Sequence, residues 1–486
     1  MKKQSPIAIL HYVLLENQAL ISFGPIFLAQ PPRKIYHINL AMYQDTIAAI
    51  STPVGEGGIG IVRLSGKKAL AIVQGLFDRQ LQNRRLVYGH IVDPESGETV
   101  DEVLVAYMKA PHTYTREDIV EIDCHGGPVP LQRILELALR SGARLANPGE
   151  FTLRAFLNGR IDLAQAESVL DVIQSKTQAS LRLAVQGLGG KLSEPIKEIR
   201  RSLMDILAYL TAKIDFPEDE VEEQDIKKPL ENAQATLQNL IANADAGMVY
   251  RHGVRTAIVG RPNVGKSSLL NRLLRQSRAI VTPIPGTTRD TLEETVNLRG
   301  VPFILIDTAG IMKSNNVVET LAVERSRKAI EQADFVLLVI DTSEPLTNLD
   351  KELIDFLAEK AVLTVANKCD LPRHAELDGL PWLEVSTSAL TGEGLEELET
   401  AMVNSVLGGK IVTSDALLVT NPRHKDALQR AESHLRLARA AMEEKLPDDF
   451  VTIDLTSALK ALGEITGETV TDELLDTIFS RFCIGK

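Results

Sequence analysis

The segment GRPNVGKS, from Gly260 to Ser267, constrains this chain more than any other feature of its sequence. It follows the apolar stretch VRTAIV, typical of a buried strand, and precedes SSLLNRLL, which has helical spacing. A glycine-rich turn between a strand and a helix directs backbone N–H groups and the helix N-terminus toward one point, which suits phosphate oxygens. Lys266 adds a positive charge, and Ser267 offers a hydroxyl group to Mg²⁺. The segment therefore predicts a nucleotide phosphate-binding loop, with an ordinary glycine-rich turn as the alternative.

A second motif, NKCD from Asn367 to Asp370, follows another apolar strand pattern and bears on the choice of base. The Asp370 carboxylate can accept hydrogen bonds from the N1–H and the N2 amino group of guanine, which adenine does not offer. Asn367 can bond another polar edge of the base, and the stem of Lys368 can cover its face. The later segment SAL would bring a backbone N–H to the base O6. Guanine is therefore the expected base.

A third motif, DTAG, follows the apolar stretch FILI. Asp307 is suited to hold Mg²⁺ through a water molecule, and the N–H of Gly310 can sense the outer phosphate. Ile311 stands where many regulatory GTPases carry a glutamine that orients the attacking water, and a hydrophobic side chain cannot do this. We therefore expect another group to supply charge and to orient water.

Asn263, inside the phosphate-binding loop, is a candidate ligand for a monovalent cation. Its side-chain oxygen would lie near the phosphates, and the segment TPIPGTTRD supplies further oxygens, with Thr288 able to reach Mg²⁺. A satisfied turn residue is the alternative for Asn263. The predicted GTP-binding set is Asn263, Val264, Gly265, Lys266, Ser267, Ser268, Thr282, Pro283, Ile284, Pro285, Gly286, Thr287, Thr288, Asp307, Thr308, Ala309, Gly310, Asn367, Lys368, Asp370, Ser388, Ala389 and Leu390.

Composition restricts the class of protein. The chain has 486 residues, 44% hydrophobic and 24% charged, which predicts about three globular domains. It contains no apolar run long enough to span a membrane. Its three scattered cysteines exclude a disulfide framework and fit a cytoplasmic location. A net charge of −12 argues against a non-specific nucleic-acid coat, although a local basic patch for one folded RNA is compatible with it.

Hydrophobic patterns predict a multidomain fold. Apolar stretches such as LVYGHIV and EVLVAYM read as strands around a glycine-rich turn at residues 55–60, and VPLQRILELALRSG reads as a helix. Helical spacing follows and returns near the end of the chain, whereas residues 254–408 alternate strands and helices, as in a parallel sheet. We predict an α+β N-terminal domain, an all-α helical domain and an inserted α/β P-loop domain with a mostly parallel sheet. Their predicted limits are 42–160, 161–252 together with 410–486, and 253–409.

Residues 1–41 differ from the rest. Two lysines precede an apolar stretch, as in a signal peptide, but no small-residue cleavage site follows. We interpret this part as an extension of uncertain status ahead of Met42, with a flexible tail as a further alternative.

From Met42 to Lys486 the sequence resembles the MnmE/TrmE family of tRNA uridine-34 modification GTPases. The shared phrases include GGIGIVRLSG, EIDCHGG, PGEFTLRAFLNGRIDLAQAESV, GRPNVGKSSLLN, PGTTRD, DTAG, NKCD and the closing RFCIGK. The resemblance implies a folate-binding-like N-terminal domain that forms a homodimer, a helical domain completed by the C-terminus, and an inserted GTPase domain. It implies that the GTPase domains meet across the dimer when GTP and K⁺ are bound.

The resemblance also implies roles for single residues. Asn263, Thr282, Ile284 and Thr287 would hold K⁺, while Ser267 and Thr288 would bind Mg²⁺. Lys266, Asp307 and Glu319 would serve in hydrolysis, with Glu319 orienting water. The alternative for Glu319 is a charged residue at a helix N-terminus, and the preceding IMKSNN is less acidic than the family pattern.

For the second site, Arg63, Glu121, Arg160 and Lys486 match the family's 5-formyltetrahydrofolate contacts, although some members carry Lys in place of Arg160. Surface ion pairs are the alternative for these residues. Cys483 would lie at the same pocket as a candidate catalytic residue, with a buried structural thiol as the alternative.

The implied activity is a K⁺-stimulated GTPase that helps to install an aminomethyl-type (carboxymethylaminomethyl) group at C5 of the wobble uridine of certain tRNAs. The carbon would come from 5,10-methylenetetrahydrofolate. A flavoprotein partner of the MnmG/GidA family would carry FAD, in a heterotetramer or larger assembly, because no dinucleotide fingerprint occurs in this chain. A pure GTPase switch is the rival class, and it would not require the N-terminal domain or the Cys483 tail. An autonomous folate-dependent aminomethyltransferase would leave the GTPase domain unexplained.

Overall fold

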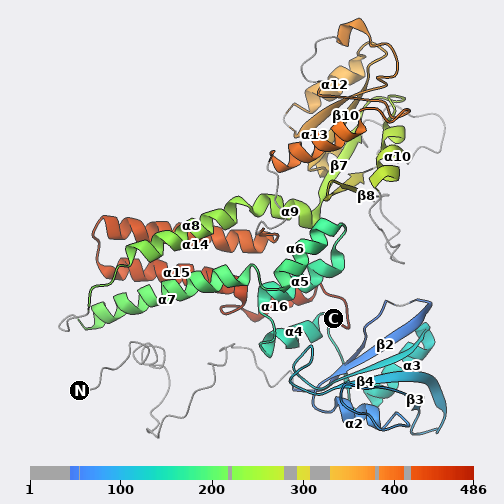
Figure 1. Ribbon diagram of the computed structural model, residues 1–486, viewed down its shortest axis with the longest axis vertical. Coiled ribbons are helices and arrows are strands. Elements are labelled where there is room, and N and C mark those ends of the chain that lie inside the picture. The colour runs from blue at the N-terminus through green and yellow to red at the C-terminus, as the bar shows by residue number, and fades with distance from the viewer. Residues whose placement is uncertain are drawn as a thin grey trace. The chain divides into compact units, whose positions relative to one another are not determined.

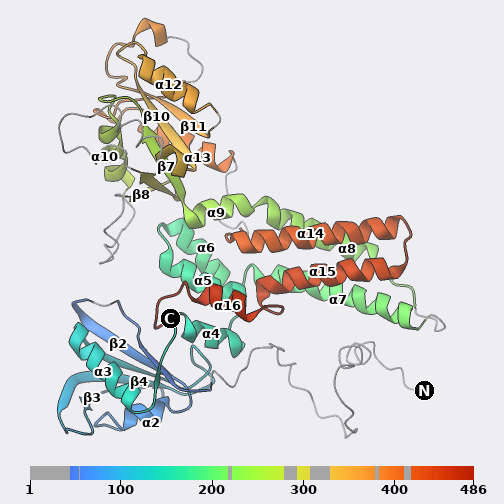
Figure 2. The same ribbon diagram turned by 180° about the vertical axis from the view of Figure 1, so that it is seen from behind.

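The computed structural model describes residues 44–53, 55–216, 222–277, 293–306, 329–358, 360–377, 383–409 and 418–486 (Figure 1 and Figure 2). The described residues form two compact units. One draws on the described residues up to Leu170, Leu188–Gln234 and Arg430–Lys486, and the other on the described residues of Asp171–Gly187 and Ala235–Gln429. Within the described part of the chain, no helix combines the length and apolar character that a membrane span requires.

The first unit contains a six-stranded mixed sheet in the order β3-β4-β5-β2-β1-β6. Its strands are β1 (Ile47–Ile50), β2 (Gly57–Ser65), β3 (Leu86–Val92), β4 (Thr99–Met108), β5 (Ile119–Gly126) and β6 (Arg144–Leu145). Helices α2 (Ala69–Gln74) and α3 (Pro128–Arg140) cover one face, where they pack on alternate side chains such as Val62, Val105 and Ile122. The intervening residues, Arg63 and Glu121 among them, therefore lie on the other face.

The predicted glycine-rich turn at residues 55–60 is only partly a turn, because β2 already begins at Gly57. Gly57 pairs with Gly126 of β5, and a register shift separates this pair from Gly60. A Cβ atom added to Gly126 would lie 2.5 Å from the carbonyl oxygen of Gly57. These glycines therefore permit the close approach of two strands rather than a chain reversal.

Helices make up the rest of the first unit. The described helices are α4 (Glu150–Leu157), α7 (Ser193–Asp215), α15 (Asp448–Thr466), α16 (Asp472–Phe479) and parts of α5, α6, α8 and α14. Helices α7 and α15 run side by side (Figure 1 and Figure 2). Arg200 of α7 donates to the carbonyl of Leu459 on α15 and pairs with Glu468 at 2.5 Å. Helices α4 and α16 pack through a core that includes Phe156 and Phe479.

Two stretches of helical spacing are each divided into two helices. Residues 163–188 form α5 (Leu163–Gln174) and α6 (Gln178–Leu188), because the Thr177 hydroxyl accepts from the backbone N–H of Ser180 at 3.1 Å and caps a new helix. Near the end of the chain, Gly467 adopts a φ of +85° and terminates α15, and Thr471 then caps α16. Because helical periodicity continues on both sides of each break, the hydrophobic pattern of the sequence does not reveal the breaks.

The second unit contains the predicted α/β fold, which is confirmed. Its sheet has the order β12-β11-β10-β7-β9-β8, and all neighbours are parallel except β8 and β9. The strands are β7 (Val254–Val259), β8 (Glu293–Leu298), β9 (Val301–Ile306), β10 (Phe335–Asp341), β11 (Val362–Asn367) and β12 (Val385–Thr387). Helices α10 (Lys266–Ser277) and α13 (Leu395–Leu407) pack on one face, and α12 (Asn348–Phe356) packs on the other.

The same unit also includes helical segments outside its sheet layers. They are α9 (Ala244–His252), the short 3₁₀ helix Ala375–Leu377 and the remaining parts of α8 (Lys227–Ala242) and α14 (Pro422–Glu443). Arg251 of α9 pairs with Asp171 at 2.7 Å, and Thr177 donates to the Gly300 carbonyl at 2.9 Å. The first contact joins Asp171 to α9, and the second joins Thr177 to the turn between β8 and β9 at the edge of the sheet.

Candidate functional site

The phosphate-binding loop connects the end of β7 to the start of α10, as the sequence predicts. Gly260 has a φ of +149°, and a Cβ atom there would lie 2.4 Å from the carbonyl oxygen of Val339. Gly265 has a φ of +99°, and its Cβ atom would lie 2.3 Å from Nδ2 of Asn367. Both conformation and space therefore require glycine at the two ends of the loop.

Lys266 and Ser267 open α10 beside this loop. The Nζ of Lys266 donates to the carbonyl oxygens of Gly260 at 2.8 Å and Arg261 at 2.7 Å, which holds its charge over the loop. Ser267 and Ser268 are exposed in the first turn of the helix. The positive end of a helix and a lysine ammonium group thus coincide at one place, where they favour an anion.

Asn367, at the end of β11, joins three segments of the site. Its Nδ2 donates to the Val264 carbonyl at 2.7 Å, and its Oδ1 accepts from the N–H of Ala389 at 3.1 Å and the hydroxyl of Thr387 at 3.4 Å. The side chain is buried. Asn367 thereby holds the phosphate loop against the segment predicted to bind the base, and its own contact with the base stays a prediction.

Lys368 and Asp370 follow at the carboxyl end of β11, where ligands of parallel sheets commonly bind. Lys368 has a φ of +68° and pairs with Asp341 at 2.6 Å. Burial alone would raise the pKa of Asp341, but hydrogen bonds from Lys368 and Ser343 outweigh it and hold that pKa below its ordinary value. Asp370 is exposed, as is Leu390 in the next loop.

Arg261 is a site residue that the sequence analysis missed. It pairs with Glu344 at 2.6 Å and lies 3.4 Å from the buried Asp350 of α12, and these contacts connect the phosphate loop to α12 and to the segment before it. Its position inside GRPNVGKS was the available signal.

Several predicted site residues lie outside the described part of the chain. They are Thr282, Pro283, Ile284, Pro285, Gly286, Thr287, Thr288, Asp307, Thr308, Ala309, Gly310 and Glu319. Among the residues that are described, no cluster of His, Cys, Asp or Glu could hold a metal ion. The predicted cations would instead use neutral oxygens. Asn263 is exposed at a φ of +66°, and Ser267 is exposed on α10, so both fit as oxygen ligands of K⁺ and Mg²⁺.

A second candidate site lies on the open face of the N-terminal sheet. The Nε of Arg63 on β2 pairs with Glu121 on β5 at 2.6 Å. The same guanidinium donates to the carbonyl oxygen of Gly485 at 3.1 Å, and Ser51 donates to that oxygen at 3.2 Å. The C-terminal tail therefore returns to the N-terminal sheet and completes this site.

Gly485 is the residue that permits this approach. It has a φ of +93°, and a Cβ atom there would lie 2.3 Å from the carbonyl oxygen of Ile50. The backbone N–H of Phe151 donates to the Lys486 carbonyl at 3.1 Å, which fixes the last residue of the tail. Any side chain at 485 would push the tail away from β1.

Aromatic rings adjoin the charged groups of this tail site. The guanidinium of Arg160 lies 4.6 Å from the ring centre of Tyr114, and that of Arg63 lies 5.8 Å from the ring centre of Phe151. Charged donors and acceptors beside aromatic faces fit a flat heterocycle with polar edges, such as a pterin. Tyr114 was not predicted, because a single tyrosine in a loop gives no usable signal.

Asp123 is a further unpredicted acid on the same face, two residues along β5 from Glu121. Its Oδ1 is buried and, within the described residues, has no hydrogen-bond partner. Burial and the neighbouring Glu121 raise its pKa. Side chains two residues apart on a strand share a face, so the predicted role of Glu121 could have pointed to Asp123.

The three thiols differ in environment. Cys483 is exposed in the tail, whereas Cys124 is buried under α3. Burial and the nearby Asp101 raise the pKa of Cys124 to about 11, so its reactive thiolate is scarce at neutral pH. Burial also raises the pKa of the half-buried Cys369.

Comparisons with known proteins decide the family. The MnmE helical-domain family matches residues 163–483, and the TrmE N-terminal family matches residues 46–160. The tRNA modification GTPase MnmE of Chloroflexus aurantiacus is 53% identical over 451 residues, covering 91% of this chain and all of that protein. The MnmE of Roseiflexus castenholzii is 52% identical and covers 92% of this chain. This chain belongs to the MnmE/TrmE family of tRNA modification GTPases.

Membership of the MnmE/TrmE family confirms three predictions: the family itself, the fold class and the enzyme class, a GTP hydrolase. The helical-domain match encloses the α/β sheet, so the MnmE helical segments flank that sheet in sequence. Among solved structures, Aquifex aeolicus Era is 30% identical, covers 38% of this chain and 67% of that chain, and gives a TM-score of 0.25. The G domain of the Thermotoga maritima FeoB transporter is also 30% identical, covers 31% of this chain and gives 0.24.

Proposed function

We propose that this MnmE/TrmE-family protein couples GTP hydrolysis to modification at C5 of the wobble uridine of certain tRNAs. The observation that carries the proposal is the pairing of two sites in one chain. Asp370, the acid predicted to select guanine, lies just after β11, and a C-terminal tail closes on Arg63 and Glu121 at the N-terminal sheet. A GTPase switch alone requires only the first of these.

At the nucleotide site, catalysis rests on positioning and charge. Mg²⁺ and K⁺ supply positive charge at the phosphates when they are bound. Lys266 binds the outer phosphates, Ser267 and Thr288 hold Mg²⁺, and Asp307 supports that site. Glu319 orients the attacking water in place of the glutamine that Ile311 replaces.

At the tail site, Arg63, Glu121, Arg160 and Lys486 bind a tetrahydrofolate derivative. When bound, this cofactor supplies the one-carbon unit for the aminomethyl-type group. The Arg63–Glu121 pair orients its polar heterocycle, and the ring of Tyr114 keeps Arg160 in place. Cys483 lies in the tail beside the site as a candidate catalytic thiol.

The proposed assembly contains a homodimer through the N-terminal domain and a flavoprotein of the MnmG/GidA family that carries FAD. The open sheet face supports the homodimer, because Leu86 and Tyr88 of β3 are 57% and 54% exposed and Ile59 of β2 is 64% exposed. We place the protein in the cytoplasm and retain the predicted domain limits of 42–160, 161–252 with 410–486, and 253–409.

Nucleoside mass spectrometry of cellular tRNA tests this function. Cells that lack the protein should lose the C5 modification of wobble uridine, and the full chain should restore it. Lys266→Ala should fail to restore it because phosphate binding is lost, whereas the exposed Lys351→Ala on α12 should succeed. Unchanged wobble uridines in the cells that lack the protein would leave a GTPase switch as the better interpretation.

The cation assignment predicts a specific ion dependence. GTP hydrolysis should be several-fold faster in K⁺ than in Na⁺ at equal ionic strength, because a site formed by neutral oxygens selects by ion size. Asn263→Ala should remove most of this difference and leave Mg²⁺·GTP binding intact, while Asn348→Ala at the exposed start of α12 should retain it. Equal rates in the two salts would refute the assignment.

A further inference from the structure

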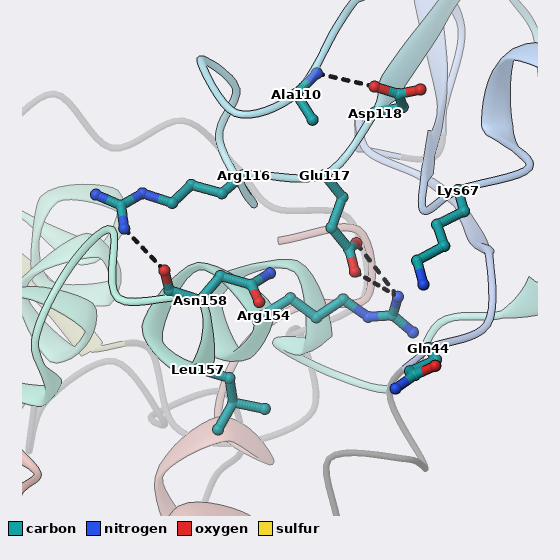
Figure 3. Close-up of a pocket in the computed structure, with 9 residues that line it drawn as sticks. All are labelled: Gln44, Lys67, Ala110, Arg116, Glu117, Asp118, Arg154, Leu157 and Asn158. Atoms are coloured by element: carbon teal, nitrogen blue, oxygen red, sulfur yellow. Dashed lines mark hydrogen bonds and ion pairs between the residues drawn. The ribbon is translucent and has the colours of Figure 1, made fainter. Parts of the chain in front are cut away.

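A cavity of about 470 Å³ lies in the first unit, apart from both sites described above (Figure 3). It is lined by Gln44, Lys67, Ala110, Arg116, Glu117, Asp118, Arg154, Leu157 and Asn158. None of the proposed folate contacts lines it. Its volume falls in the range typical of small-molecule pockets, about 300–1,000 Å³.

The acids of this cavity are already engaged by the protein. Glu117 accepts from the Ser65 hydroxyl at 2.7 Å and from the Arg154 guanidinium at 3.3 Å. Asp118 accepts from the N–H of Ala110 at 2.8 Å and from the Tyr107 hydroxyl at 3.3 Å. Glu117 is thereby paired with a cation, and two neutral donors hold Asp118 in place.

Arg154 is also engaged, and it forms a fixed wall. Its side chain is 1% exposed and pairs with Asp45 at 2.5 Å and Glu150 at 2.9 Å in addition to Glu117. Partners on three sides hold this guanidinium in one orientation. Its charge is largely neutralised where it stands, so it contributes shape and hydrogen bonding more than free charge.

The remaining cations are not neutralised. Lys67 is exposed, and no described residue forms an ion pair or hydrogen bond with its amino group. Arg116 gives one N–H to the Asn158 carbonyl at 2.9 Å and has no acidic partner in the described residues. In Figure 3 the Lys67 side chain extends toward the joined Glu117 and Arg154 side chains and ends beside them. Lys67 and Arg116 are therefore the cations lining this cavity that have no carboxylate partner among the described residues.

We propose that this cavity binds a small organic anion whose phosphate or carboxylate group contacts Lys67 and Arg116. An anionic head group alone would fill only part of the volume. Ala110 and Leu157 provide apolar contacts for the body of the ligand, and the Gln44 amide provides a donor and an acceptor. A cationic ligand would meet two uncompensated cations.

Thermal unfolding of the full chain tests the proposal with inorganic phosphate and acetate as head-group probes. Saturating Mg²⁺ and GDP keep the phosphate loop occupied. At the same ionic strength, at least one probe should raise the unfolding temperature of the first unit more than chloride does, because a ligand that binds the folded state stabilises it. A response to phosphate alone identifies a phosphate-type ligand, and a response to acetate alone identifies a carboxylate.

Two variants separate the cavity from general salt effects. Lys67→Gln should weaken the apparent affinity for the effective probe about tenfold, whereas the exposed neighbour Lys68→Gln, which does not line the cavity, should retain it. Arg116→Gly should also weaken binding without loss of fold, since Arg116 has a φ of +59° that glycine adopts freely. Equal stabilisation of the parent chain and Lys67→Gln would mean that the anions act by exclusion from the surface, and it would overturn the proposal. So would the absence of any stabilisation beyond that of chloride.

Discussion

Replacing Asp370 with Asn is expected to lower the affinity for GTP by about a hundredfold or more and to create affinity for xanthosine triphosphate. The variant would lose the two charge-assisted hydrogen bonds that the Asp370 carboxylate accepts from guanine N1–H and the N2 amino group, each worth about 1.5–3 kcal/mol. An amide can instead donate to the C2 carbonyl of xanthine. Equilibrium titration of both nucleotides against Asp370→Asn measures the exchange of specificity.

Asp355→Asn is the matched control for this change. Asp355 is exposed on α12 and is not part of the predicted base site, so its replacement should leave both affinities unchanged. Tight GTP binding by Asp370→Asn would show that another group selects the base, and Asp370 would then have to be reassigned as a surface acid.

Replacing Arg154 with Met is expected to lower the free energy of unfolding of the N-terminal region by about 3–5 kcal/mol. Methionine keeps much of the volume but removes the cation that Asp45, Glu117 and Glu150 share, so Asp45 and Glu150 keep only Arg144 and Glu117 loses its ion pair. Glu150 is 1% exposed, so it cannot regain full hydration. Native-state hydrogen exchange of the β1 and α4 amides measures the loss within this region, independently of the other unit.

The loss of unfolding free energy in Arg154→Met should become smaller as the pH falls. Burial would raise the pKa of Glu150, but hydrogen bonds from Arg144, the Asn147 backbone and Arg154 outweigh it and hold the pKa below its ordinary value. The ionised carboxylate therefore adds stability above about pH 4.3, the ordinary glutamate pKa, and this contribution is lost as the pH falls. The difference between Arg154→Met and the parent chain should narrow at acidic pH.

Arg140→Met supplies the control, because Arg140 is exposed at the end of α3. Its exchange pattern should match that of the parent chain at every pH. An Arg154→Met variant with unchanged protection would indicate that Arg144, which already pairs with Asp45 and Glu150, suffices for these carboxylates, and Arg154 would then carry little of the stability.

Local chemistry explains which parts of this protein were predictable from its sequence. The phosphate loop was predictable because glycines, a lysine and a hydroxyl group follow one another directly between a strand and a helix. The strands of the N-terminal sheet were predictable because their hydrophobic alternation is regular. In each case the residues that determine the structure are neighbours in the chain.

Features that depend on distant contacts were not predictable in this way. Asn367 stays a predicted contact of the base, but the bonds of its amide to Val264 and Ala389 were not predicted, because only the folded sheet creates them. The cavity at Lys67 and Arg116 likewise arises where separate loops meet α4. The helix breaks near Thr177 and Gly467 had local signals, but the apolar periodicity around them was stronger.

The returning tail has a consequence for the order of folding. The hydrogen bond from Arg63 to Gly485 joins residues 422 positions apart, and a contact of this span forms late, after the segments between its ends have become compact. The N-terminal sheet can assemble first from its own contacts, whereas the α4–α16 core, like the tail, joins segments that are far apart in the sequence. The pocket at Arg63 therefore matures only in chains whose N-terminal sheet and C-terminal helix have both reached their native form.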